Sequence, residues 1–131
     1  MRYLSVALAG AVGALSRHLL GLWIIALLPS PFPLHTLLIN LTGSLLLGFV
    51  AGFGIERGHL PEPWRLPVTV GLIGSYTTFS TWSVETVLLL ETGRWGLALL
   101  NVAASLALGL AAVWLGHTLA HRIGAEPQRS R

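Results

Sequence analysis

Four long apolar runs, separated by short polar or proline-rich connections, make up most of the 131-residue chain. The runs cover residues 3–28, 34–55, 66–90 and 95–120. A helix needs about 20 mostly apolar residues to cross a bilayer, and each run reaches that length. The only charged residues within the runs are Arg17 and Glu85. The pattern predicts one all-α transmembrane domain, 1–131, with four membrane-spanning helices and a polar C-terminal tail at 121–131.

The composition supports a membrane protein. Apolar residues make up 53% of the chain and charged residues only 10%, whereas ordinary globular proteins carry about 25% charged residues. Cysteine is absent, which excludes disulfides and thiolate metal sites. The net charge of +3 comes from scattered arginines without a basic stripe, so we expect membrane lipid around the chain and no nucleic-acid partner. The expected location is the cell membrane, as a multi-pass protein.

Small and polar residues recur every three or four positions in three of the runs, so each set shares one helix face. The sets are Gly10, Gly13, Ala14, Arg17 and Gly21 in the first run, Asn40, Ser44, Gly48 and Gly52 in the second, and Asn101, Ser105, Gly109, Ala112 and Gly116 in the fourth. Small residues at this spacing allow helix backbones to approach closely, so these faces are predicted to pack against other helices.

Two amides and two charges interrupt the apolar runs. Asn40 and Asn101 are expected either to bond to a neighbouring helix or to face a polar cavity. Arg17 lies deep in the first run, so its side chain either reaches an interface or faces a water-filled vestibule, where it attracts anions. Glu85 is close to the end of the third run, and we expect it to be exposed at the interface.

The third run contains the polar sequence GSYTTFSTW at 74–82, which is rich in hydroxyl groups. Lipid offers these groups no partners, so the stretch predicts a helix broken near its middle, with hydroxyls bonding the freed backbone. Gly74 is the expected break point, and Thr78 or a neighbour is expected to cap the second half. Carbonyls at such a break suit a hard cation, whereas amide, hydroxyl and aromatic-edge donors suit an anion. A continuous helix kinked at the glycine is the alternative.

No constellation of side chains predicts an enzyme. His117 and His121 are four residues apart, the spacing of a paired metal site on one helix face. The sequence around them lacks the glutamate and third ligand of a zinc-protease motif, so a metal role is disfavoured.

Three sequence stretches together resemble the CrcB/Fluc family of fluoride channels. GSYTTFSTW at 74–82 is similar to the family's signature Gly-x-x-Thr-Thr-Phe-Ser-Thr-Phe. GAVGALSRH at 10–18 resembles the glycine/arginine motif of its first helix, and HTLLINLTGSLLLG at 35–48 resembles its second-helix motif. The stretches occur in the family's order and helices, and the resemblance covers residues 3–120.

The resemblance implies an antiparallel homodimer of dual topology, with two fluoride pores along the interface and a structural Na⁺ on the two-fold axis. Main-chain carbonyls of Gly74 and Thr77 would hold the sodium ion. The residues that it implies for the fluoride route are Asn40, Phe79, Trp82 and Ser105, with Arg17 in the vestibule.

The chain departs from the family pattern at two positions in its third and fourth runs. Trp82 stands where a second phenylalanine is usual, and Asn101 stands where we would expect a tyrosine. The pathway also needs weak, neutral hydrogen-bond donors, which Thr78, Ser80 and Thr81 provide. The expected function is passive export of fluoride that lowers its concentration in the cytoplasm.

A small dual-topology drug/proton antiporter is the alternative function. That class needs a carboxylate in its first helix, and the only charged residue of the first run is Arg17.

The orientation of the chain in the membrane is a separate question, because the arginines favour one side of the membrane. Four spans place Arg2, Arg57, Arg65, Arg122, Arg129 and Arg131 on one side and Arg94 on the other. This bias favours cytoplasmic termini, whereas the family resemblance predicts both orientations.

Overall fold

The computed structural model of the protein describes residues 2–123, and every regular element in that range is helical. In chain order the elements are α1 (Arg2–Leu27), α2 (Leu34–Phe49), η1 (Val50–Glu56), α3 (Glu62–Leu66), η2 (Pro67–Ile73), α4 (Gly74–Tyr76), α5 (Phe79–Glu91) and α6 (Trp95–Ile123). The predicted all-α class is confirmed. Of the predicted polar tail, 121–123 complete α6, and 124–131 lie outside the described residues.

Three helical stretches are long and apolar enough to cross a membrane. They are α1, the continuous stretch Leu34–Glu56 and α6. Large apolar side chains point outward from them, such as Leu110 and Trp114 on α6, which are 73% and 68% exposed. A multi-pass membrane protein is therefore confirmed. The predicted run 66–90 is not among these stretches, because it is divided between shorter helices.

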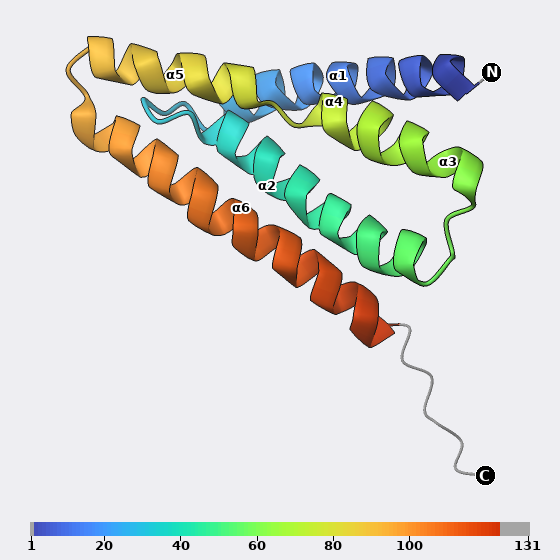
Figure 1. Ribbon diagram of the computed structural model, residues 1–131. Coiled ribbons are helices and arrows are strands. Elements are labelled where there is room, and N and C mark those ends of the chain that lie inside the picture. Colours follow the sequence, from blue (N-terminus) through green and yellow to red (C-terminus); the bar gives the residue numbers. More distant parts are fainter. Residues whose placement is uncertain (1, 124–131) are drawn as a thin grey trace.

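The helices form two neighbouring layers (Figure 1). α1 packs along η2 and α4, while α2 packs mainly along α6. The beginning of α1, the loop after η1 and the end of α6 lie at one end of the molecule. The loops 28–33 and 92–94 lie at the opposite end. Successive helices therefore run up and down, and α5 continues from α4 towards the second end.

Glycines bring several of these helices into close contact. Gly48 lies directly against the α6 backbone, and Gly116 lies directly against the α2 backbone, so a Cβ at either position would overlap main-chain atoms. Gly13 meets the backbone of η2 in the same way. The predicted close approach is confirmed at these positions. Gly109 differs, because outside its own stretch of helix no described residue has an atom within 4 Å of the position its Cβ would take.

Proline and glycine shape the segment that carries the polar sequence. Pro67 has no N–H, and the turn that follows it is widened to π-helical bonding, in which the Gly74 N–H reaches the carbonyl of Thr69. Gly93 ends α5 with φ 73°. Its N–H bonds to the Leu90 carbonyl at 3.0 Å, and the next N–H returns to Leu89 at 2.8 Å. This Schellman motif reverses the chain into α6.

The helical run from Glu62 stops at Tyr76 and resumes at Phe79. Between them the backbone is extended, with φ −79° and ψ 158° at Thr77 and φ −148° and ψ 122° at Thr78. Gly74, the expected break point, is itself helical at φ −64° and ψ −33°. The interruption therefore lies after the glycine, and its position follows from contacts with α2 described below.

Candidate functional site

The Asn40 side chain from α2 holds the extended residues in place. Its Nδ2 donates to the Thr78 carbonyl at 3.0 Å, and its Oδ1 accepts from the Thr78 N–H at 2.8 Å. Both backbone groups of a residue outside the helices are thereby satisfied by one amide, which a buried chain requires. Of the two roles considered from the sequence, the bond to a neighbouring segment of the chain is present, and the same residue also borders a cavity.

Two main-chain carbonyls before the interruption have lost their usual partners. In a continuous helix the Thr78 N–H would bond to the Gly74 carbonyl, but it bonds to Asn40 instead. The Gly74 carbonyl instead accepts a long hydrogen bond from the Thr77 hydroxyl, at 3.5 Å. The Ser75 carbonyl accepts the Arg17 Nε–H at 3.3 Å. The guanidinium group of Arg17 therefore lies beside the interruption.

The hydroxyl groups of Thr78, Ser80 and Thr81 lie together at the start of α5. Thr78 caps α5, because its Oγ1 accepts the Thr81 N–H at 3.2 Å, as its position in the sequence suggested. The same oxygen lies 3.0 Å from the Thr81 hydroxyl and 3.3 Å from that of Ser80. Ser80 is exposed and Thr81 is half-buried.

A cavity of about 300 Å³ lies between α2, α5, α6 and the extended residues. Six of the residues selected from the sequence line it: Asn40, Thr77, Thr78, Phe79, Trp82 and Ser105. The Ser105 hydroxyl is buried and has no hydrogen-bond partner within residues 2–123. An unpartnered buried hydroxyl is costly, so a ligand or water in this cavity would stabilise it.

A second cavity of about 210 Å³ lies on the α1 side of the interruption. It is lined by Arg17, Thr78 and Thr81, among others. Thr78 thus borders both cavities. Arg17 is half-buried there.

Phe79 and Trp82 form an aromatic pair on the first turn of α5. Their ring centroids lie 5.0 Å apart and the planes are tilted by 41°. Phe79 is 77% exposed in this chain, which is unusual for a large apolar ring unless lipid or another chain covers it. The indole N–H of Trp82 donates to the Asn101 carbonyl at 3.4 Å, so that donor is directed at the α6 backbone.

Asn101, Gly74 and Ser80 are not among the residues that line these two cavities. The Asn101 side chain is fully buried, and its Nδ2 donates to the Thr86 hydroxyl at 2.9 Å. Its Oδ1 has no hydrogen-bond partner among the described residues. Asn101 therefore ties α6 to α5, whereas Gly74 and Ser80 are exposed.

The expectation that Glu85 is exposed at an interface is wrong. Its side chain is only 17% exposed, its Oε1 accepts the Thr36 hydroxyl at 2.7 Å, and the same oxygen lies 3.1 Å from His35 Nε2. Its Oε2 is buried and has no hydrogen-bond partner in the described part of the chain. Sequence reasoning missed this group because His35 and Thr36 belong to another helix. An acid inside an apolar run was the one available signal.

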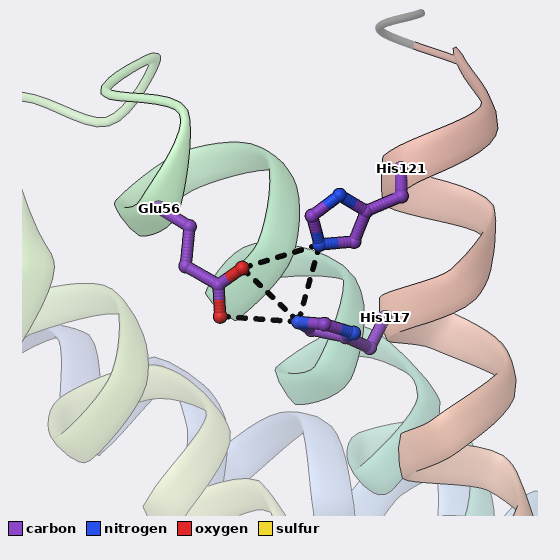
Figure 2. A group of neighbouring side chains, drawn as sticks. All are labelled: Glu56, His117 and His121. Carbon is purple, nitrogen blue, oxygen red and sulfur yellow. Dashed lines mark hydrogen bonds and ion pairs between the residues drawn. The ribbon is translucent and has the colours of Figure 1, made fainter.

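Sequence reasoning also missed a partner for the two histidines of α6. Glu56, at the end of η1, lies 3.0 Å from His117 and 3.2 Å from His121 (Figure 2). The glutamate that the local sequence lacks is thus supplied by a different helix.

Comparisons with known proteins agree over nearly the whole chain. The family model described as "CrcB-like protein, Camphor Resistance (CrcB)" matches residues 4–117. The chain is 73% identical to the fluoride-specific ion channel FluC 2 of Symbiobacterium thermophilum, over 89% of this chain and 95% of that one. It is 46% identical to fluoride-specific ion channel FluC of Acidobacterium capsulatum, over 95% of this chain and 100% of that one. It is 48% identical to FluC 2 of Geobacillus kaustophilus, over 98% of this chain and 96% of that one.

Proposed function

The chain belongs to the CrcB family, and on that premise we propose that it is a fluoride-specific ion channel of the cell membrane. The observation that carries the proposal is the 73% identity to a fluoride channel over 89% of the chain. The protein is a membrane channel and not an enzyme. Passive flow through it lowers the fluoride concentration in the cytoplasm.

The cavity between α2, α5 and α6 is the proposed fluoride route. Fluoride is small and strongly hydrated, and burying it bare would cost on the order of tens of kcal/mol. A pore therefore has to replace the hydration shell with donors that bind weakly enough to release the ion. The unpartnered Ser105 hydroxyl, the Asn40 amide and the Thr78 hydroxyl are neutral donors of this kind, and all three residues line the cavity.

Aromatic edges and further hydroxyls complete the proposed route. Phe79 and Trp82 direct ring edges, which carry partial positive charge, at a passing anion. Thr81 and Ser80 continue the row of hydroxyls from Thr78. Asn101 contributes indirectly, because its backbone carbonyl orients the Trp82 ring.

Arg17 is proposed to attract fluoride into a vestibule without trapping it. Its Nε–H is already engaged by the Ser75 carbonyl, and the residue borders the smaller cavity rather than the larger one. A fixed positive charge beside the route raises the local anion concentration.

The working unit is proposed to be an antiparallel homodimer with two pores, each subunit a single domain of four membrane-spanning helices. The third crossing is made by the α3–α4 run and α5 together. The 77% exposure of Phe79 and the open space around Gly109, both on the border of the larger cavity, support a second chain that covers this side. A partner there would close the cavity into a pore.

A structural sodium ion is proposed to be held by carbonyls of Gly74 and Thr77 from both subunits. The donor chemistry fits, because hard cations prefer oxygen ligands and the Gly74 carbonyl has lost its helical N–H partner to Asn40. The ion would supply positive charge at the dimer centre. Asn40 would keep the carbonyl available by holding the Thr78 N–H.

Fluoride efflux from liposomes tests the function. Purified protein in vesicles loaded with potassium fluoride should release fluoride when a potassium ionophore is added, and vesicles loaded with chloride should release far less. Proton-coupled uptake of an organic cation without fluoride efflux would favour the small drug/proton antiporter instead. Absence of both activities from a folded dimer would overturn the proposed function.

A further inference from the structure

Glu56, His117 and His121 form a three-residue cluster, the end cluster, where η1 and α6 finish (Figure 2). His117 Nε2 lies 3.0 and 3.1 Å from the two oxygens of Glu56, and His121 Nε2 lies 3.2 Å from Oε2. The two Nε2 atoms are 3.4 Å apart. We propose that the end cluster binds a divalent transition-metal ion, with Zn²⁺ the best match.

Protons alone do not account for all the contacts in the end cluster. An ionised carboxylate only accepts hydrogen bonds, and each neutral Nε2 carries at most one hydrogen. The three side chains make three pairwise contacts, and two hydrogens can bridge only two of them. The third contact therefore brings two polar atoms together with no hydrogen between them. A cation in the centre would instead satisfy the lone pairs of both nitrogens and the carboxylate at once.

The distances fit a tetrahedral ion. Zinc–nitrogen bonds of about 2.0–2.1 Å in tetrahedral geometry place neighbouring ligand atoms about 3.3–3.4 Å apart. The two Nε2 atoms already have this separation, at 3.4 Å. The carboxylate contacts of 3.0–3.2 Å are slightly shorter, so the Glu56 side chain would move outward by a few tenths of an ångström. Figure 2 shows all three ligand groups directed at the same space.

The donor set selects the class of metal. Two imidazoles and one carboxylate suit zinc, copper, nickel or iron, whereas magnesium and calcium prefer oxygen ligands throughout. Three protein ligands leave a fourth position for water or an anion. The side chains of Glu56, His117 and His121 are 50%, 41% and 46% exposed, so an ion can enter directly from water.

The packing of η1 against α6 holds Glu56 close to His117. Gly52, one turn before Glu56, lies against α6, where an added Cβ would be 2.9 Å from the Ala120 Cβ and 3.2 Å from the His117 ring. This close approach places the end of η1 beside the last turns of α6. A bound ion would therefore fasten the two helices together at this end of the molecule.

Arg57 disfavours metal binding by His121 and therefore provides a further test. Its Nη2 donates to the His121 carbonyl at 2.6 Å and lies 3.5 Å from His121 Nδ1. Arginine has only donors, so the longer contact favours hydrogen on Nε2, the nitrogen that would have to bind the metal. Metal-bound histidines normally carry hydrogen on the other nitrogen. Binding would break the 3.5 Å contact and keep the 2.6 Å bond.

Zinc titration of the purified full-length chain tests the proposal. The protein should carry no histidine tag and be freed of metal with a chelator before calorimetry. We expect one Zn²⁺ per chain. Because loss of a group that merely supports a ligand weakens metal affinity by about 10–100-fold, His117→Ala, His121→Ala and Glu56→Gln should each weaken it by more than about 100-fold. Arg57→Gln should strengthen it.

Matched controls come from the same end of the chain. His59→Ala removes an exposed histidine that contacts the Phe53 carbonyl, and Glu62→Gln removes an exposed acid that pairs with Arg2. Both should bind zinc as the wild type does. X-ray absorption of the loaded protein should show nitrogen and oxygen ligands at about 2.0–2.1 Å with imidazole scattering.

Two results would overturn the proposal. The first is wild-type protein that binds Zn²⁺ no more tightly than about 1 mM, which would mean that the end cluster holds ion pairs only. The second is unchanged affinity in a double His117→Ala, His121→Ala variant that elutes as folded protein, which would place the metal elsewhere.

Discussion

Polar side chains at the centre of the molecule bond mostly to main-chain atoms, whereas those of the end cluster bond to one another. Asn40 bonds to both backbone groups of Thr78, and Arg17 bonds to the Ser75 carbonyl. Glu56 pairs with the side chains of two histidines in an exposed position. A central substitution therefore changes the path of the chain, while a substitution in the end cluster changes only local charge and ligands.

The largest effect is expected from Asn40→Asp. The carboxylate cannot donate to the Thr78 carbonyl, and it places a negative charge on the anion route. Loss of a buried hydrogen bond alone costs about 1–3 kcal/mol, and repulsion of the anion adds to it, so fluoride efflux should fall by at least about a hundredfold. Thr42→Val on the exposed side of α2 should retain efflux. Normal efflux in a folded Asn40→Asp dimer would show that Asn40 serves helix packing and not the fluoride route.

The next largest effect is expected at the aromatic pair. Phe79→Ile and Trp82→Ile keep apolar bulk but remove the ring edges that face the anion, so each should lower fluoride efflux by about tenfold. Phe53→Ile is the matched control, because Phe53 stacks on Phe49 and His59 away from the cavity. Equal efflux in all three variants would exclude both rings from the route.

Gly74→Leu and Thr77→Ser test the sodium ion at the same centre. A Cβ added at Gly74 would lie 3.4 Å from the Thr69 carbonyl, which is its nearest contact among the described residues outside its own turn. Leucine should nevertheless lower dimer content and efflux, because it fills space that the partner and ion would occupy. Thr77→Ser keeps the carbonyl and should change efflux less than about twofold. A Gly74→Leu dimer with normal sodium dependence would contradict the proposed ligand.

The arginine bias is expected to have only a partial effect on the orientation of the chain in the membrane. Of the six arginines on the side of the termini, three belong to the C-terminal part that emerges last, so the remaining bias is weak. Reporters fused to the C-terminus should therefore be active on both sides of the membrane. Activity on the cytoplasmic side alone would rule out an antiparallel dimer made from this chain only.

The smallest effect is expected for Glu56→Gln without metal. The side chain is exposed, and surface ion pairs contribute little to stability. The melting temperature and fluoride efflux should both match the wild type in the presence of a chelator. A large loss of either would show that the end cluster supports the fold as Asn40 does.

The sequence predicted the features that depend on local pattern. Apolar runs predicted helices, and the spacing of Gly48 and Gly116 predicted close helix contacts, because helix periodicity places those residues on one face. The row of hydroxyls marked the region where α4 ends and α5 begins, and the capping role suggested for Thr78 is confirmed.

The features that the sequence did not predict depend on contacts between helices. The interruption follows Gly74 because Asn40 of another helix captures Thr78, and no local signal reveals that bond. Glu56 meets His117 only after η1 and α6 pack together. Glu85 is half-buried, and His35 and Thr36 of α2 supply its partners. Spacing singled out Asn40 and Ser105, but the grouping of these residues with Phe79 and Trp82 along one route came from the family resemblance.

The interruption at Thr77 and Thr78 also separates electric charge within the membrane. Aligned peptide dipoles give a helix roughly half an elementary positive charge at its first turn and an equal negative charge at its last. The negative end at α4 is offset by Arg17, which bonds to the Ser75 carbonyl. The positive end at α5 is capped only by the neutral oxygen of Thr78. An anion beside Thr78 therefore meets the positive end of α5, while the charge of Arg17 is partly engaged by the Ser75 carbonyl at the end of α4.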